Sequence, residues 1–209
     1  MIFSETLIPR LRERLRQPLP GLNAQMRMAP PIRGRVYAVP PDAHRSAVLA
    51  LLYPHRAQFY LAFMQRSEDG RVHSGQISFP GGRHEPADRD FVHTALREAE
   101  EEMGIPAEKV EVLGSLTELY IPPSNSLVYP AVGYLDHRPA FVLNPQEVAA
   151  AVEVEVARFW QENVHGIHEV DVFNGTYIQA PGYTIDGRLI WGATAMMVAE
   201  LMAVLESLD

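Results

Sequence analysis

The stretch that decides the fold opens with Gly81-Gly82 and closes with Arg97-Glu98-Ala99-Glu100-Glu101-Glu102-Met103-Gly104. We predict a helix over residues 90–103, because apolar side chains recur there at helical spacing. Gly104 suits a left-handed helix cap, and Pro106 prevents the helix from continuing. The apolar stripe consists of Val92, Leu96, Ala99 and Met103.

Three glutamates crowd one side of this helix. At the helical repeat, Glu98, Glu101 and Glu102 fall within an arc of about 100°. Glu98 and Glu102 repel each other at a cost of ~0.2–0.5 kcal/mol, and the helix dipole disfavours each exposed anion near its C-terminus by ~0.3–1 kcal/mol. A bound Mg²⁺ or Mn²⁺ would remove this conflict, since both ions prefer oxygen ligands. The helix alone leaves an ordinary solvated acidic face as the alternative.

The diglycine favours the metal-site interpretation. Glycine allows a tight backbone turn, so Gly81 and Gly82 can present carbonyl and N–H groups to a metal ion or a phosphate. The sequence contains neither a Gly-x4-Gly-Lys phosphate loop nor a defensible Ser-His-Asp arrangement.

The helix and the diglycine together resemble the Nudix hydrolases, whose box is Gly-x5-Glu-x7-Arg-Glu-U-x-Glu-Glu-x-Gly-U, with U a bulky aliphatic residue. The sequence departs from this box in three ways: Asp88 replaces the first Glu, eight residues separate it from Arg97, and Ala99 replaces the aliphatic residue. The matching residues are Gly82, Arg97, Glu98, Glu101, Glu102, Gly104 and Ile105.

An upstream signature resembles one branch of that family, the coenzyme A pyrophosphatases. It reads Arg66-Ser67-x3-Arg71-x3-Gly75-x3-Phe79-Pro80-Gly81-Gly82. The resemblance implies an α+β fold, a Nudix-type α/β/α sandwich with a mixed sheet and extra helices near both ends. It also implies metal-dependent hydrolysis of coenzyme A to 3′,5′-ADP and 4′-phosphopantetheine. The alternatives are another substrate, such as ADP-ribose, NADH or a dinucleoside polyphosphate, or a catalytically silent nucleotide sensor.

The resemblance also implies residue roles. Metal ligands are expected at Glu98, Glu101, Glu102 and Gly82. Catalytic carboxylates are expected at Glu98, Glu101 and Glu147, where Glu147 is a fourth ligand, the base or an ordinary acid before a strand. Arg97 is expected to orient Glu101 rather than to touch substrate. Substrate contacts are expected at Arg66, Arg71, Gly81 and Gly82, with His73 in a structural or positioning role.

The whole chain of 209 residues suits a single domain, residues 33–209, on which residues 1–32 pack as a helix and an extended connector. A net charge of −8 argues against nucleic acid or an anionic membrane as partner. No cysteine is present, which excludes disulfides and a Cys nucleophile. Without a visible signal or membrane segment, we expect a cytoplasmic protein with a small-molecule substrate.

Further elements follow from periodicity. We predict a helix over residues 4–16 and a final helix over 192–206. The final helix is apolar almost all round, so it must be buried against the domain or a second copy of the chain; a monomer and a homodimer both remain open. Strands are expected at 33–39, 47–53, 59–65, 75–79, 110–119, 127–135, 148–156, 168–173 and 177–179, and a short helix is expected near 158–163.

Overall fold

The computed structural model describes residues 6–31, 38–67, 75–173 and 175–208. Its main sheet is mixed: the strand order is β3-β2-β1-β7-β5, β1 and β7 run parallel, and the other pairs are antiparallel. The central strands are β1 (His44–His55), β2 (Gln58–Arg66) and β7 (Ser126–Tyr134), flanked by β3 (Ile77–Ser78) and β5 (Glu111–Ser115). Three strands pair off this path: β4 (Gly81–Arg83) on β1, β6 (Leu119–Ile121) on β7 and β8 (Val148–Glu155) on β2.

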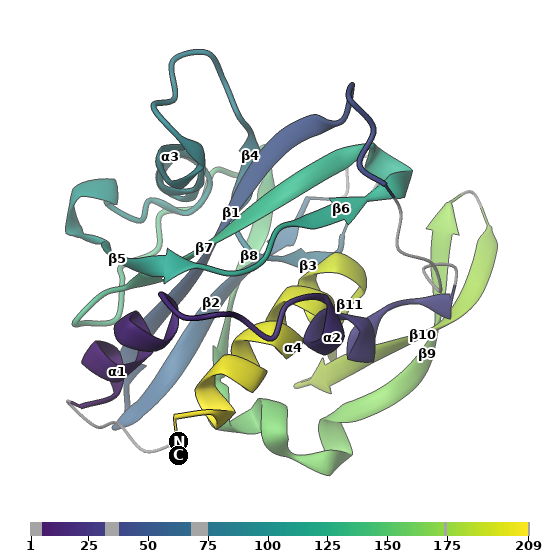
Figure 1. The fold of residues 1–209 in the computed structure, drawn as a ribbon. Coiled ribbons are helices and arrows are strands. Elements are labelled where there is room, and N and C mark those ends of the chain that lie inside the picture. The colour runs from purple at the N-terminus through teal and green to yellow at the C-terminus, as the bar shows by residue number, and fades with distance from the viewer. Residues whose placement is uncertain (1–5, 32–37, 68–74, 174, 209) are drawn as a thin grey trace.

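Helices cover both faces of the main sheet (Figure 1). The helix α3 (Phe91–Met103) packs on one face through Ala95, Ala99 and Met103, in a core cluster with Leu49 and Leu51 of β1. On the opposite face lie α1 (Leu7–Arg14), α2 (Leu22–Gln25) and α4 (Gly192–Glu206). The expected α/β/α sandwich with additional helices near both ends is confirmed.

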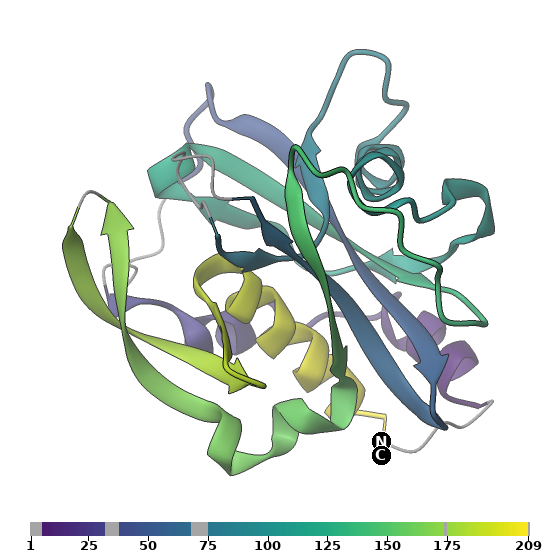
Figure 2. The same ribbon diagram turned by 180° about the vertical axis from the view of Figure 1, so that it is seen from behind.

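A separate three-stranded antiparallel sheet stands beside α4 (Figure 2). Its strands are β9 (His165–Phe173), β10 (Thr176–Ile185) and β11 (Arg188–Trp191), with β10 in the centre. Short 3-10 turns lead into it from β8: η5 (Val156–Trp160) and η6 (Glu162–Val164). The remaining 3-10 turns are η1 (Met26–Met28), η3 (Ala107–Lys109) and η4 (Pro122–Ser124).

The two end helices are buried as their sequences require. α1 buries Leu7, Ile8 and Leu11, and α4 buries most of its residues in the same core cluster. The apolar surface of α4 is thus covered within the chain, without a second copy. None of the helices in the described ranges is long and apolar enough to cross a membrane.

Four sequence expectations differ from the structure. Residues 17–31 are not simply extended, because α2 and η1 form there. The expected strand 110–119 is interrupted between β5 and β6, and the expected short strand 177–179 is the much longer β10. The short helix expected at 158–163 consists of 3-10 turns. Most of the expected strand 33–39 lies outside the described residues.

Candidate active site

The diglycine brings the main sheet and α3 into close contact. Gly81 and Gly82 lie in β4 and pair with Val48 and Ala47 of β1. A Cβ atom on Gly81 would lie 2.3 Å from the Ala47 carbonyl oxygen, and one on Gly82 would lie 2.4 Å from the Glu98 carboxyl group. Gly81 therefore excludes a side chain, whereas Gly82 leaves space that the Glu98 carboxylate fills and that a Cβ could occupy only by displacing this carboxylate.

The helix α3 begins and ends where the sequence predicts. The Asp90 side chain accepts a hydrogen bond from the His93 backbone N–H at 2.7 Å, and Gly104 adopts a left-handed φ of 66°. The buried face differs from the expected stripe, since Ala95 and Ala99 face the core fully buried whereas Val92 and Leu96 are only partly buried. Two alanines toward the sheet allow a close approach of α3, which places its acids beside β4.

Glu102 is the most deeply buried of the three acids, with 2% of its side chain exposed. It accepts a hydrogen bond from the Gly81 backbone N–H at 2.8 Å and lies 3.9 Å from the Arg66 guanidinium. Burial raises the pKa of the Glu102 carboxyl to about 8, while the Gly81 N–H and Arg66 act in the opposite direction. The negative charges of Glu98 and Glu147 raise the same pKa further.

Glu98 lies in a similar environment, with 14% of its side chain exposed. Burial raises the pKa of its carboxyl, Arg97 lowers it, and the charges of Glu101 and Glu147 raise it. Glu147 thus acts electrostatically on both Glu98 and Glu102. Its backbone carbonyl accepts a hydrogen bond from the Ser67 N–H at 2.9 Å, which ties the turn before β8 to the end of β2.

Arg97 organises the exposed side of this group. Its guanidinium lies 3.0 Å from a Glu98 carboxylate oxygen and donates a 3.0 Å hydrogen bond to Glu101. It also donates a hydrogen bond of 3.1 Å to the Arg83 carbonyl oxygen. The expected contact between Arg97 and Glu101 is present, and Arg97 also reaches the loop before α3.

Asp88 holds Arg97, a role that the sequence reasoning missed. Asp88 accepts hydrogen bonds from Arg97 Nε at 2.9 Å and Nη2 at 3.1 Å, from Thr94 Oγ1 at 2.9 Å and from the Glu85 N–H at 3.0 Å. These donors hold the Asp88 pKa well below its usual value despite burial, with Arg97 as the largest cause. The signal was available, because Asp88 occupies the place of the first acid of the box.

The expected substrate contacts are described only in part. Arg66 ends β2 with 33% of its side chain exposed, beside the buried Glu102. Arg71 and His73 lie outside the described residues. Gly81 and Gly82 lie between β1 and α3 as given above.

The donor chemistry suits a divalent cation. Glu98 and Glu102 are carboxylates held away from water next to a backbone cradle that a Cβ would fill, and a cation would compensate their burial. Among the described residues, no three His, Asp or Glu side chains converge as a ready-made metal-binding group. Glu98 and Glu101 instead pair with Arg97, and Glu101 is 57% exposed. Cation binding therefore requires these two carboxylates to turn from Arg97.

Comparison with known proteins gives the family. The NUDIX domain model matches residues 43–170. Two relatives carry the description "Uncharacterized Nudix hydrolase NudL": the Photorhabdus laumondii protein is 38% identical over 77% of this chain and 84% of its own length. The Yersinia enterocolitica protein is 36% identical over 77% of this chain and 80% of its own length.

Solved structures agree on the fold. The Nudix hydrolase RenU from M. smegmatis superposes with a TM-score of 0.56 at 16% identity, covering 87% of this chain and 95% of its own. A MutT/nudix family protein from Enterococcus faecalis gives a TM-score of 0.51 at 13% identity, covering 99% of this chain and 76% of its own. The family match spans more than half of the chain and both the diglycine and α3, so this protein belongs to the Nudix hydrolase family.

Proposed function

We propose that this Nudix hydrolase splits the pyrophosphate bond of coenzyme A, or of its derivatives, into 3′,5′-ADP and 4′-phosphopantetheine, with Mg²⁺ or Mn²⁺. The observation that carries the proposal is the Arg66–Gly82 signature, which continues directly into the acidic helix. Arg66 supports it, because its partly exposed guanidinium lies beside the buried Glu102. A guanidinium at this place suits a phosphate of the substrate.

Hydrolysis of a diphosphate brings two anions together, a hydroxide-like water and the charged substrate. A divalent cation supplies charge neutralisation and a lower pKa of the attacking water when it is bound. Glu98, Glu101, Glu102 and the Gly82 carbonyl oxygen are the proposed ligands. Arg66, with Arg71 from the same signature, is proposed to bind substrate phosphates, and the backbone of Gly81 and Gly82 to line the diphosphate.

The base is proposed among Glu98, Glu101 and Glu147. A carboxylate that takes the proton of the attacking water must be ionised and free of the metal during that step. Glu147 is the candidate outside α3, and its charge acts on both Glu98 and Glu102. Loss of kcat in Glu147→Gln without a change in the magnesium requirement would assign it as the base rather than as a ligand.

A substrate panel tests the proposal. Purified protein with Mg²⁺ is incubated separately with coenzyme A, ADP-ribose, NADH and a dinucleoside polyphosphate, and the products are separated by chromatography. We expect 3′,5′-ADP from coenzyme A at the highest kcat/KM of the four. A higher kcat/KM for another compound of the panel would show that this compound, and not coenzyme A, is the preferred substrate. Binding without turnover of any compound would indicate a catalytically silent sensor. Arg66→Gln is expected to raise KM for coenzyme A, whereas Arg10→Gln, an exposed change on α1, is not.

A further inference from the structure

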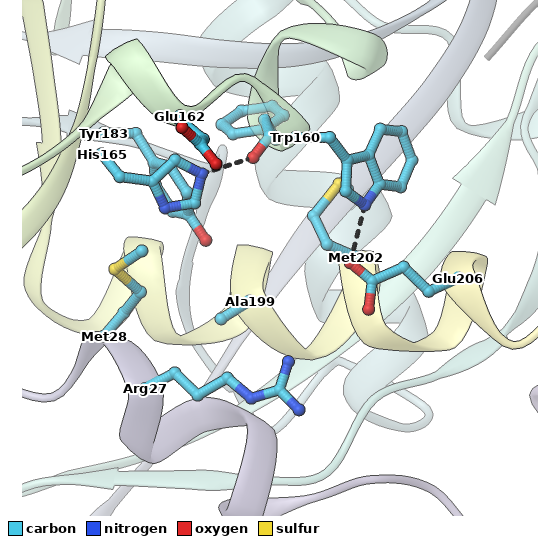
Figure 3. A pocket seen from close by; sticks show the side chains of 10 residues that line it. Arg27, Met28, Trp160, Glu162, His165, Tyr183, Ala199, Met202 and Glu206 are labelled. Carbon is cyan, nitrogen blue, oxygen red and sulfur yellow. Dashed lines mark hydrogen bonds between the residues drawn. The ribbon is translucent and has the colours of Figure 1, made fainter.

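A cavity lies on the face of the main sheet opposite α3. It has a volume of about 500 Å³ and is lined by residues of η1, η5, η6, α4, β9 and β10. Small-molecule sites typically measure about 300–1,000 Å³ and combine apolar walls with a few polar groups. Most of the walls are apolar or aromatic side chains (Figure 3): Met28, Phe159, Trp160, Tyr183, Ala199 and Met202.

Two polar groups of this cavity already have partners within the protein. His165 Nε2 donates a 2.8 Å hydrogen bond to the Phe159 carbonyl oxygen, and Trp160 Nε1 donates a 2.7 Å hydrogen bond to Glu206. Because a carbonyl oxygen only accepts, the proton of a neutral His165 ring lies on Nε2. Neither N–H is therefore available to a ligand.

Two donors remain unused. Tyr183 is 3% exposed, its hydroxyl points into the cavity in Figure 3, and that hydroxyl has no hydrogen-bond partner among the described residues. Burial raises the pKa of this hydroxyl, the charge of Glu206 raises it too, and the charge of Arg27 lowers it. Arg27 forms no ion pair with any residue in the described ranges, although it lines the same cavity. Because this hydroxyl opens into the cavity rather than being sealed from solvent, a water molecule or a ligand can serve as its hydrogen-bond partner.

The free donors and the charges define the ligand. One guanidinium and one hydroxyl suit a single carboxylate, and the aromatic walls suit a flat or branched apolar body. Glu162 and Glu206 outnumber Arg27 at the same cavity, so they disfavour a phosphate monoester and favour a carboxylate that carries its own ammonium group. They leave room for an ammonium group beside the carboxylate.

We propose that this cavity binds a small monocarboxylate with an aromatic or branched apolar body, whose carboxylate is held by Arg27 and the Tyr183 hydroxyl. The site goes beyond the hydrolytic function and does not depend on it, since α3 and its acids lie across the main sheet. Two sources share this chemistry: a plain aryl carboxylic acid and an apolar α-amino acid. The glutamates decide between them.

Binding is tested on the full chain by calorimetry and by fluorescence. The chain has two tryptophans, so a Trp191→Phe background reports Trp160 at the cavity alone. The probes are 3-phenylpropionate, L-phenylalanine and 2-phenylethylamine, each up to about 10 mM. We expect saturable binding of at least one carboxylate with one molecule per chain, and weaker binding of the amine. The carboxylate that binds more tightly shows whether the ligand is a plain aryl carboxylic acid or an apolar α-amino acid.

Variants give the decisive comparison. Arg27→Gln is expected to weaken carboxylate binding about tenfold or more, and Tyr183→Phe about threefold to tenfold. Arg10→Gln, an exposed arginine of α1, serves as the matched control and is expected to bind like the unmodified chain. Absence of saturable binding of both carboxylates, equal binding of the amine, or unchanged affinity in Arg27→Gln would overturn the proposal. Because Arg27 is exposed, its replacement is not expected to disturb folding.

Discussion

Asp88 and Arg97 form a two-point ion pair, with Arg97 Nε 2.9 Å and Nη2 3.1 Å from the two Asp88 carboxylate oxygens. The pair closes the loop between β4 and α3 and fixes the arginine that faces Glu98 and Glu101. Geometry at the acidic helix therefore depends on a residue that binds neither substrate nor metal in our proposal.

Asp88→Asn is expected to lower the free energy of unfolding by about 3 kcal/mol, since it leaves the Arg97 charge without its buried partner. Urea denaturation measures this loss. Because the folded-state pKa of Asp88 is depressed, its stabilisation is present above the unfolded-state value of 3.8 and is lost as the pH falls below it. The loss of stability as the pH falls below 3.8 should therefore be smaller in Asp88→Asn. Glu100→Gln, an exposed change on α3, is the control, and equal stability of both variants would contradict the role of Asp88.

The raised pKa of Glu102 predicts a dependence of stability on pH opposite to that of Asp88. Its pKa is 4.5 in the reference state and about 8 in the folded protein, so the folded state holds a proton that the unfolded state releases. Stability of the metal-free protein should therefore fall as the pH rises from 4.5 to about 8. Thermal unfolding in EDTA measures this fall, which should shrink in Glu102→Gln. Added Mg²⁺ should restore stability most strongly near pH 8, because it favours the ionised carboxylate. A pH profile identical in the variant would contradict the assignment.

The two glycines should respond differently to alanine. The new Cβ of Gly82→Ala would meet only the flexible end of Glu98, so the fold should survive while the carboxylate is displaced. We expect a loss of activity of about 10–100-fold, equivalent to ~1.4–2.7 kcal/mol, with a small change in melting temperature. Gly81→Ala would instead meet the backbone of Ala47 and Val48, so it should destabilise the protein strongly. Calorimetry and a hydrolysis assay of both variants distinguish the two effects; an active Gly82→Ala would show that Glu98 tolerates displacement.

Glu200 of α4 is fully buried and ties three segments together. Its carboxylate accepts hydrogen bonds from the Gly21 N–H at 3.1 Å, from Gln25 Nε2 at 2.8 Å and from Thr117 Oγ1 at 2.6 Å. Glu200→Gln places an amide donor against these donors, so we expect a loss of about 2–4 kcal/mol in urea denaturation. Catalytic constants of the folded variant should remain unchanged. Unaltered stability would show that the carboxylate contributes no net stabilisation.

The same contacts explain which parts of the fold the sequence could predict. The bounds of α3 and α4 follow from local signals: the Asp90 and Gly104 caps, and an apolar composition around α4. The break between β5 and β6 and the helix α2 depend instead on Thr117 and Gln25 meeting Glu200, far along the chain. Such long-range contacts produce no periodic pattern in the sequence from which they could be predicted.

The hairpin between β10 and β11 had a local signal that periodicity overlooked. Asp186 and Gly187 both adopt positive φ, at 51° and 76°, as a tight two-residue hairpin turn requires. Pro181-Gly182 lies inside β10, although such a dipeptide is typical of a turn, and β10 therefore continues well past the expected strand 177–179. In the site, the acids and the diglycine were predictable from spacing, whereas the link from Asp88 through Arg97 to Glu98 and Glu101 required the folded loop.

One assay tests the central claim, that the acids of α3 hold a divalent cation against a diphosphate. Release of 3′,5′-ADP from coenzyme A is measured at saturating Mg²⁺ for the unmodified chain and for Glu98→Gln, Glu101→Gln, Glu102→Gln and Glu100→Gln. We predict turnover by the unmodified chain and by Glu100→Gln, and a loss of about 10²–10⁴-fold in kcat for the other three. Near-normal turnover in any of those three folded variants would contradict the claim.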